Sequence, residues 1–351
     1  MKLLETPDNP APRGAIVRAV TTTDGVVLRA AHWVPEAGAA RGTIVLLHGR
    51  AEFVEKYFEV VGELLGRGFA VVTFDWRGQG GSGRALVDER LGHVAHFSEF
   101  RYDVEAIFRE VVARLPKPAF ALAHSMGGCV ALAGAAEGWL PAARLVATTP
   151  MLALSLVKHA RLARWLARVL GWLGLSGRLV PGGRLESIST EPFGGNRLSG
   201  DASRYARNAA VATALGSGAI GSPTVGWLNA AFDAMEAVAA KGFGARVAVP
   251  TLIVGAGSDP VCSTPAIEAF ARSLGRGSTF LAIPGSRHEV LMETDEVRAT
   301  FWRAFDAFIP GSATTPEKVG SAAEPLENDL VQPLVPASHD GTTSRGGAAV
   351  P

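Results

Sequence analysis

The chain has 351 residues, of which 48% are hydrophobic and 19% are charged, and its formal net charge is +1. This length is enough for one large domain or two ordinary ones with a buried core. With almost no net charge and no dense run of Lys and Arg, the sequence gives no reason to expect a nucleic-acid partner. Only two cysteines are present, which excludes a disulfide framework and a zinc-type pattern, and both are expected to be small buried residues.

The N-terminus, MKLLETPDNPAP, has too short an apolar stretch for a signal peptide. Elsewhere, Arg, Asp or Gly interrupts every apolar run well before the ~20 residues that a membrane-spanning helix needs. The sequence therefore predicts a soluble protein, cytoplasmic by default.

The first predicted element is a β-hairpin around the Asp24-Gly25 turn signal. After it, short and almost wholly apolar strands alternate with helices. The predicted strands are 43–49, 69–76, 119–125, 143–150, 251–259 and 278–285, and the predicted helices are 54–66, 100–114, one ending near 136, and 295–308. Continuously apolar strands separated by helices are typical of a mostly parallel central sheet flanked by helices on both faces.

The alternation stops near residue 150 and resumes at residue 251. We therefore expect the core to be divided into an N-terminal half, 1–150, and a C-terminal part, 241–310, with a helical insertion at 151–240. Residues 311–351 are rich in Ser, Thr, Pro, Ala and Gly and contain no Phe, Trp or Tyr, so a disordered tail is expected there.

The segment AHSMGG, residues 123–128, lies between a buried strand and a small-residue helix. A sharp strand-to-helix turn of this kind, a nucleophile elbow, exposes a serine hydroxyl at the carboxyl edge of a sheet. The free N–H groups at the start of the helix would face the same site. Ala123 replaces the first Gly of the usual G-x-S-x-G pattern, which is a mild departure. Ser125 is therefore the candidate nucleophile, and a structural serine in a tight turn is the alternative.

A serine hydroxyl needs a base to act as a nucleophile, and in such a fold the order along the chain is serine, acid, histidine. His288 follows the last predicted strand, and Asp259 ends the strand before it, so these two are the candidate base and acid. The other downstream candidates fall in helical patterns or in the tail: His159, His339, Asp233 and Asp295.

The intermediate of acyl transfer carries a negative oxygen that needs N–H donors. One donor is expected to be the main chain of Met126, directly after the serine, and the other the main chain of Arg50, in the loop after the first core strand. In the same loop, Gly49 would let the backbone approach the substrate, and His48 and Gly49 are both expected to contact it.

Five segments appear in the order and approximate spacing of one known group: HGRAEFVEKYFEV, FDWRGQGGSGR, AHSMGG, GAGSDPVC and PGSRHE. Over about residues 20–310 the chain resembles the monoacylglycerol lipase and lysophospholipase group of α/β-hydrolases, especially the lysophospholipase L2-like, serine aminopeptidase-like members. The resemblance implies an α/β-hydrolase fold with a helical cap. It also implies a triad of Ser125, Asp259 and His288, with Arg50 and Met126 at the oxyanion hole.

The resemblance further implies that Glu52 supports the oxyanion loop from below, and that Asp75 and Arg77 brace the turn after the next strand. Trp227 and Leu228 are expected to line an acyl channel, and a role in core packing is the alternative. The implied reaction is ester hydrolysis through an acyl-enzyme, with no metal or cofactor, on a small-molecule or lipid ester such as a monoacylglycerol or lysophospholipid. A serine hydrolase of another substrate, such as a small ester or peptide amide, and a non-catalytic binding protein are the alternatives.

The start of the insertion has a basic and an apolar stripe at helical spacing. The basic residues are Lys158, Arg161, Arg164 and Arg168, and the apolar ones are Leu162, Leu166, Val169 and Leu173, with Trp165 and Trp172 close by. Two interpretations are open: a cap helix whose apolar side faces the core, or a helix that makes peripheral contact with a membrane surface.

Overall fold

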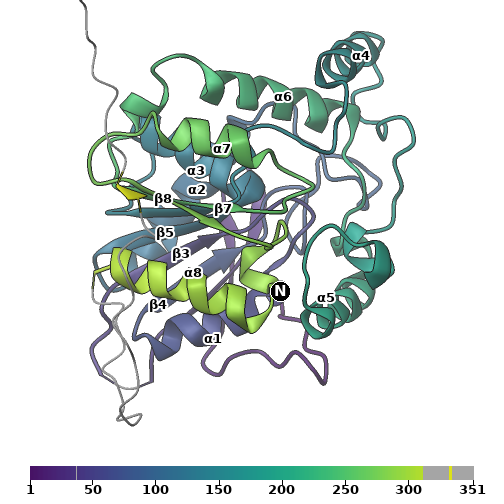
Figure 1. Cartoon of the computed structure of the whole chain (residues 1–351). Helices are drawn as coiled ribbons and strands as arrows, with labels where there is room; N and C mark the ends of the chain where they lie inside the picture. The colour runs from purple at the N-terminus through teal and green to yellow at the C-terminus, as the bar shows by residue number, and fades with distance from the viewer. Residues whose placement is uncertain (37, 311–331, 334–351) are drawn as a thin grey trace, which may run out of the picture.

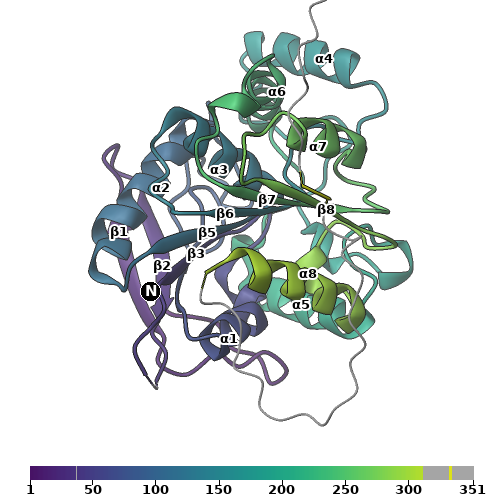
Figure 2. The same cartoon turned by 60° about the vertical axis from the view of Figure 1, so that its left-hand side comes forward.

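The computed structural model describes residues 1–36, 38–310 and 332–333. Their strands form one sheet in the order β1-β2-β4-β3-β5-β6-β7-β8-β9, which Figure 2 shows from the β1 edge to β8. The strands are β1 Ile16–Thr21, β2 Val27–Trp33, β3 Thr43–Leu47, β4 Ala70–Phe74, β5 Ala119–His124, β6 Leu145–Thr148, β7 Thr251–Ala256, β8 Thr279–Ile283 and β9 Gln332–Pro333.

The six strands from β4 to β8 in the sheet order are parallel, while β1, β2 and β9 pair antiparallel at the edges. Every residue of β3, β4, β5, β6 and β7 is buried. Strands buried on both faces have no polar side to present, which explains their continuous apolar runs. The mostly parallel sheet predicted from those runs is confirmed.

The α-helices of the described residues are α1 Phe58–Gly66, α2 Glu99–Glu110, α3 Ser125–Glu137, α4 Ala160–Trp172, α5 Ala202–Leu215, α6 Val225–Ala239, α7 Thr264–Ala271 and α8 Asp295–Phe308. Figure 1 shows α1 and α8 on one face and α2, α3 and α7 on the other. One apolar core cluster lies under each set. Helix α7 was not among the predicted elements, although Ser263 caps its first turn and Pro265 follows, a typical helix start.

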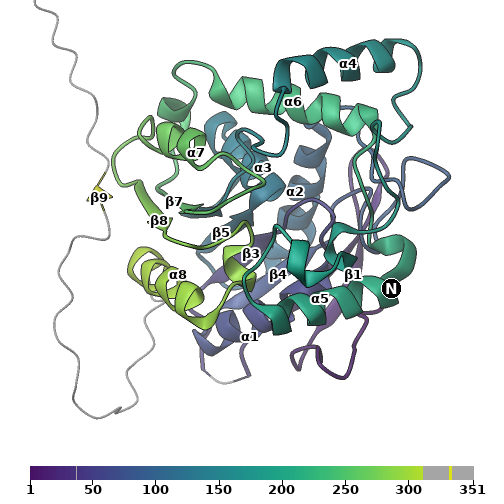
Figure 3. The ribbon, with the colours of Figure 1, turned by 45° about the vertical axis from the view of Figure 1, so that its right-hand side comes forward.

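The insertion, residues 151–240, carries α4, α5 and α6 between β6 and β7. In Figures 1 and 3, α4 lies against α6 above the sheet, whereas α5 lies on the other side, beyond α1. No helix in the described part of the chain is both long and apolar enough to cross a bilayer. The expected tail at 311–351 lies outside the described residues except for β9, which pairs with β8.

The start of α3 lies very close to the carboxyl end of β3. A Cβ on Gly127 would come within 2.2 Å of the main-chain oxygen of Leu47 and 2.6 Å of that of His48. Backbone atoms cannot move aside as a flexible side chain can. Glycine is therefore needed here to let helix and sheet approach.

We expect Gly127→Ala to lower the free energy of unfolding by about 1–3 kcal/mol, because the methyl group overpacks this contact. Gly62→Ala is the matched control, since Gly62 is an exposed glycine in α1 with open space around its Cα. It should raise stability by up to about 1 kcal/mol through helix propensity. Denaturant titration measures both, and equal effects of the two changes would contradict the prediction.

Candidate active site

Ser125 occupies the turn between β5 and α3, and its φ is +50°. A non-glycine residue in this region is strained, and such strain is held only where the surrounding structure fixes it. Here Gly127 and Gly128 fix it, because α3 can pack against the end of β3 and against Pro150 only without side chains there. The elbow predicted from AHSMGG is thus present as a strained strand-to-helix turn.

The structure brings Ser125, His288 and Asp259 together from three loops at the carboxyl edge of the sheet. His288 Nε2 lies 3.0 Å from Ser125 Oγ, and His288 Nδ1 lies 2.9 Å from Asp259 Oδ2. With the ring proton on Nδ1, where the carboxylate accepts it, Nε2 is left to accept from the serine hydroxyl. The arrangement can therefore activate Ser125 as a nucleophile.

Asp259 is held as an anion. Its Oδ1 accepts hydrogen bonds from the amides of Val261, at 2.8 Å, and Cys262, at 2.9 Å. Burial opposes ionisation of the carboxyl, but the hydrogen bond and charge of His288, together with these amides, outweigh it and lower the pKa of Asp259. The fixed carboxylate orients His288 for the serine.

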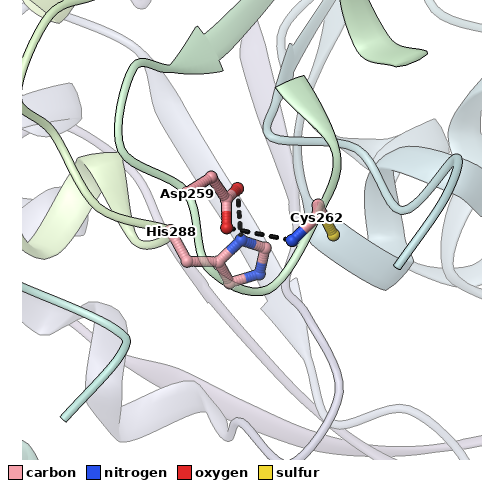
Figure 4. Close-up of side chains that lie close together, drawn as sticks. All are labelled: Asp259, Cys262 and His288. Atoms are coloured by element: carbon pink, nitrogen blue, oxygen red, sulfur yellow. Dashed lines mark hydrogen bonds and ion pairs between the residues drawn. The ribbon is translucent and has the colours of Figure 1, made fainter. Parts of the chain in front are cut away.

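Asp259, Cys262 and His288 also lie close enough for their donor atoms to resemble a metal site (Figure 4). Burial, followed by the Asp259 charge, raises the pKa of the Cys262 thiol well above its usual range, so the sulfur is protonated. Metal ligation needs a thiolate and a free imidazole nitrogen. Both nitrogens of His288 already have partners in Asp259 and Ser125. The donor set therefore fits a proton relay better than an ion.

The loop after β3 leaves one amide open beside the serine. The N–H of Gly49 donates to Glu52 Oε2, and that of Ala51 donates to Gln79 Oε1 at 2.5 Å. Between them, the N–H of Arg50 has no hydrogen-bond partner within the described residues. The N–H of Met126 is also free, since the first amides of a helix have no intrahelical acceptor. These are the two donors that the sequence analysis proposed for the oxyanion hole.

A buried ionic bridge joins the oxyanion loop to the histidine loop. Lys56 Nζ lies 2.9 Å from Glu52 Oε1 and 2.6 Å from Glu289 Oε1, and all three side chains are at most 7% exposed. Burial of Lys56 opposes its charge, but the two carboxylates raise its pKa above the usual range. Burial also opposes ionisation of Glu52, and its pKa is nevertheless lowered, with Lys56 the largest favourable cause. Tyr57 completes the set by donating to Glu52 at 2.7 Å.

Further contacts hold the two histidines near the serine. Thr149 Oγ1 donates to the main-chain oxygen of His288 at 2.9 Å. His124 lies with its ring centroid 4.9 Å from that of His288, and its Nδ1 lies 3.1 Å from Thr148 Oγ1. Burial lowers the pKa of His124 to about 3, so it is neutral and adds no charge beside the base.

The turn after β4 contains the two residues that the sequence analysis expected to brace it. Asp75 accepts from Arg29 Nε at 2.5 Å and from the amide of Gly81 at 2.7 Å. Arg77 Nε donates to Asp103 at 2.7 Å, and its Nη1 donates to Asp24, also at 2.7 Å. These groups support the loop and do not line the cavity at the serine.

A cavity of about 660 Å³ opens at Ser125 and His288. Gly49, Trp227 and Leu228 line it, while Trp227 also belongs to the apolar core and Leu228 packs against that core, so their contact with a substrate stays a prediction. His48 does not. It is fully buried below the loop with Nδ1 2.8 Å from the oxygen of Gly49, because its side chain points into the core between Tyr57 and Trp76. The placement of His48 among the substrate contacts is corrected accordingly.

Sequence reasoning missed Lys56 and Glu289. Both are charged residues of a kind that is almost never fully buried unless paired, so a single sequence gives no sign that they face inward. The only available signal was position, because Glu289 directly follows His288 and Lys56 lies four positions after Glu52.

The parallel sheet, the strained serine turn and the serine–histidine–aspartate contacts at the carboxyl edge are the features of the α/β-hydrolase class. The family model described as serine aminopeptidase, S33, matches residues 38–295. The chain belongs to this family.

Relatives and solved structures agree with this assignment. Lysophospholipase L2 of Escherichia coli strain K12 is 31% identical over 277 residues, covering 76% of this chain and 79% of its own length. The monoglyceride lipase of Saccharomyces cerevisiae is 32% identical over 121 residues, 33% of this chain and 37% of that protein. A soluble variant of the yeast lipase, solved with a substrate analog, superposes with a TM-score of 0.69 at 18% identity, covering 88% of this chain and 99% of that one. The monoacylglycerol lipase of Paleococcus ferrophilus gives 0.62 at 22% identity, with 81% and 99% covered.

We expect Lys56→Met to lower the free energy of unfolding by about 3–5 kcal/mol, because it leaves two buried carboxylates without their cation. The control is Arg272→Met, which breaks an exposed ion pair with Glu268 in the same chain and should cost less than about 1 kcal/mol. Denaturant unfolding followed by fluorescence gives both values. A Lys56→Met protein as stable as the control would show that the bridge contributes little.

Proposed function

We propose that this chain is a serine hydrolase of carboxylic esters that works through an acyl-enzyme. The observation that carries the proposal is the continuous chain of contacts from Ser125 Oγ through His288 to Asp259. The family and its named relatives support the same class of reaction.

In the proposed mechanism, Ser125 Oγ attacks the ester carbonyl carbon while His288 Nε2 accepts the hydroxyl proton. The negative oxygen that forms accepts hydrogen bonds from the amides of Arg50 and Met126. His288 then donates its proton to the leaving alcohol. A water molecule, activated by the same imidazole, attacks the acyl-enzyme and releases the acid. Asp259 stabilises the imidazolium and keeps the ring oriented throughout.

We further propose that the ester is that of a lipid with one acyl chain, and that the insertion acts as a cap over it. Apolar side chains from the core and from the insertion line much of the cavity: Met151, Leu154, Leu156, Val157, Val180, Trp227, Leu228 and Val261. Such a wall suits an acyl chain, and the polar groups that fix orientation gather near Ser125. The relatives named lysophospholipase and monoglyceride lipase support the same substrate class.

Ser125→Ala should lower kcat on a p-nitrophenyl ester by about 10⁴–10⁶-fold, because the nucleophile is lost while the fold is kept. Asp259→Asn should lower it by about 10⁴-fold through the wrong histidine tautomer. A fluorophosphonate probe should label the native chain and Ser203→Ala, a change at an exposed serine, but not Ser125→Ala. Near-native esterase activity in Ser125→Ala would refute the proposal.

We also propose that the insertion contacts a membrane surface through α4. Several large apolar residues of this helix face outward: Leu162 and Trp165 are each 60% exposed and Trp172 is 87% exposed, and Leu173, directly after the helix, is 58% exposed. These exposed fractions favour the interpretation of membrane contact over that of an ordinary cap helix. An outward apolar face with basic residues at its margins is typical of helices that lie in a bilayer interface.

The opposite side of α4 explains this orientation. Ala163, Ala167 and Gly171 recur every four residues, and Asn229 Nδ2 on α6 donates to the oxygen of Ala167 at 3.3 Å. Two arginines also turn towards α6: Arg164 pairs with Asp233 and Glu236, and Arg168 pairs with Asp233 at 3.1 Å. Small residues and ion pairs thus fix the inner side and leave the large apolar residues outside.

Replacing both Trp165 and Trp172 by Ser should weaken binding to vesicles containing an anionic lipid by at least about tenfold, since two large apolar side chains no longer enter the interface. Hydrolysis of a short-chain soluble ester should be unchanged, because neither residue lines the cavity. Val87→Ser, at an exposed apolar residue far along the chain from α4, is the control. Vesicle sedimentation gives the affinities, and unaltered binding by the double variant would rule out this surface.

A further inference from the structure

The side chain of Arg50 is a buried cation in the wall of the cavity. Its Nη1 donates to the oxygen of Gly221 at 2.8 Å, and its guanidinium carbon lies 4.8 Å from the ring centroid of Trp227. The other two nitrogens, Nε and Nη2, are shielded from solvent and have no hydrogen-bond partner in the described part of the chain. No carboxylate among the described residues lies within ion-pair distance of it.

Such an arrangement is costly. Burying a charge without a counter-charge is strongly unfavourable, and buried polar groups are normally hydrogen-bonded. Burial alone lowers the pKa of Arg50 to about 9, which reflects the cost of the isolated charge. Arg29 and Arg298, each only 4% exposed, both have two carboxylates beside them. Arg50 differs from them in lining the cavity.

The missing partner is therefore expected to come from outside the chain. Because the fork of a guanidinium presents parallel N–H donors, it matches the oxygens of a phosphate or carboxylate. A purely structural role would be to hold the insertion against the oxyanion loop through the oxygen of Gly221 and the ring of Trp227. A neutral side chain could make such contacts without the cost of burying a charge. The charge itself points to an anionic ligand.

We propose that Arg50 forms the subsite for the phosphate of a lysophospholipid head group, so that the enzyme selects phosphate-bearing lipids over neutral monoacylglycerols. This inference rests on the proposed esterase function. The main-chain N–H of Arg50 would bind the ester carbonyl oxygen, and its side chain would bind the phosphate one glycerol unit away. One residue would thus set the distance between the scissile bond and the head group.

The contacts of Arg50 also indicate how the phosphate enters. Gly221 and Trp227 both belong to the insertion, so a movement of the insertion that admits the lipid would also uncover the guanidinium. Arg184, an exposed residue whose main chain pairs with Ser222, is also among the residues that line the cavity. It provides a second cation at the same cavity.

The test compares lysophosphatidylcholine and monoacylglycerol with the same acyl chain in the native enzyme and in Arg50→Met. Losing a charge-assisted hydrogen bond should lower the ratio of kcat/KM for the phospholipid to that for the neutral lipid by about 10- to 100-fold. Arg50→Lys should restore part of the ratio, since it restores the charge without the fork. Arg178→Met, at an exposed arginine of the insertion outside the cavity lining, should leave the ratio as in the native enzyme.

A second measurement does not depend on turnover. An ether analogue of the lysophospholipid should protect Ser125 from a fluorophosphonate better than 1-O-alkylglycerol does, and Arg50→Met should abolish the difference. Equal losses for both lipids in Arg50→Met, or equal protection in the native enzyme, would overturn the subsite. The subsite would also be overturned if glycerol 3-phosphate or a free fatty acid protected Ser125 as well as the ether analogue does. The anion bound by Arg50 would then not be a lipid head group. An unlabelled native enzyme would instead contradict the proposed function.

Discussion

The hydrogen bond between Ser125 and His288 is the contact on which the rest of this site depends, and it joins residues 163 positions apart in the chain. No local preference can hold such a pair at 3.0 Å, so each partner is fixed by its own set of packed or charged neighbours. The serine is fixed by a strained turn that exists only because glycines let α3 approach β3. The histidine is fixed by Asp259 at its side chain and by Thr149 at its main chain.

A buried ionic bridge holds the two loops around that contact in place. Lys56 lies between Glu52 of the oxyanion loop and Glu289 of the histidine loop, so one ammonium group ties together the two segments that must act on the same carbonyl. Buried bridges of this kind are weak evidence for net stability, since desolvation offsets much of the attraction. In this chain the bridge fixes the positions of the oxyanion loop and the histidine loop relative to each other. A hydrophobic replacement could fill the space but could not hold the Gly49 amide through Glu52.

The fold and the central site residues could be predicted from the sequence because they follow local rules. Strands buried on both faces read as continuous apolar runs, and the elbow demands small residues around Ser125. The supporting residues could not be predicted in this way. Lys56 resembles an exposed lysine until its two carboxylate partners are known, and they are 4 and 233 positions away.

Helix α4 of the insertion is a second example of a feature that the sequence predicts only in part. The spacing of its residues predicts an amphipathic helix correctly, but the pattern does not say which side meets the protein. In the structure, the side with Ala163, Ala167 and Gly171 meets α6, and Ala167 is buried there. Arg164 and Arg168 form exposed ion pairs with Asp233 and Glu236 of α6, which contribute little by themselves.

A series of contacts links the outer surface of the insertion to the reaction centre. Helix α4 is seated on α6, α6 carries Trp227, and Trp227 lies against the side chain of Arg50, whose main-chain amide faces the proposed oxyanion site. A shift of α6 together with the segment before it, which contains Gly221, would therefore remove both contacts that enclose the guanidinium and would leave its charge open to solvent or to an anion. An uncompensated charge is less costly in water than in the interior, so exposure of the guanidinium would lower the cost of the isolated charge. A phosphate bound at the proposed subsite would lower that cost inside the cavity instead, because it supplies the counter-charge there.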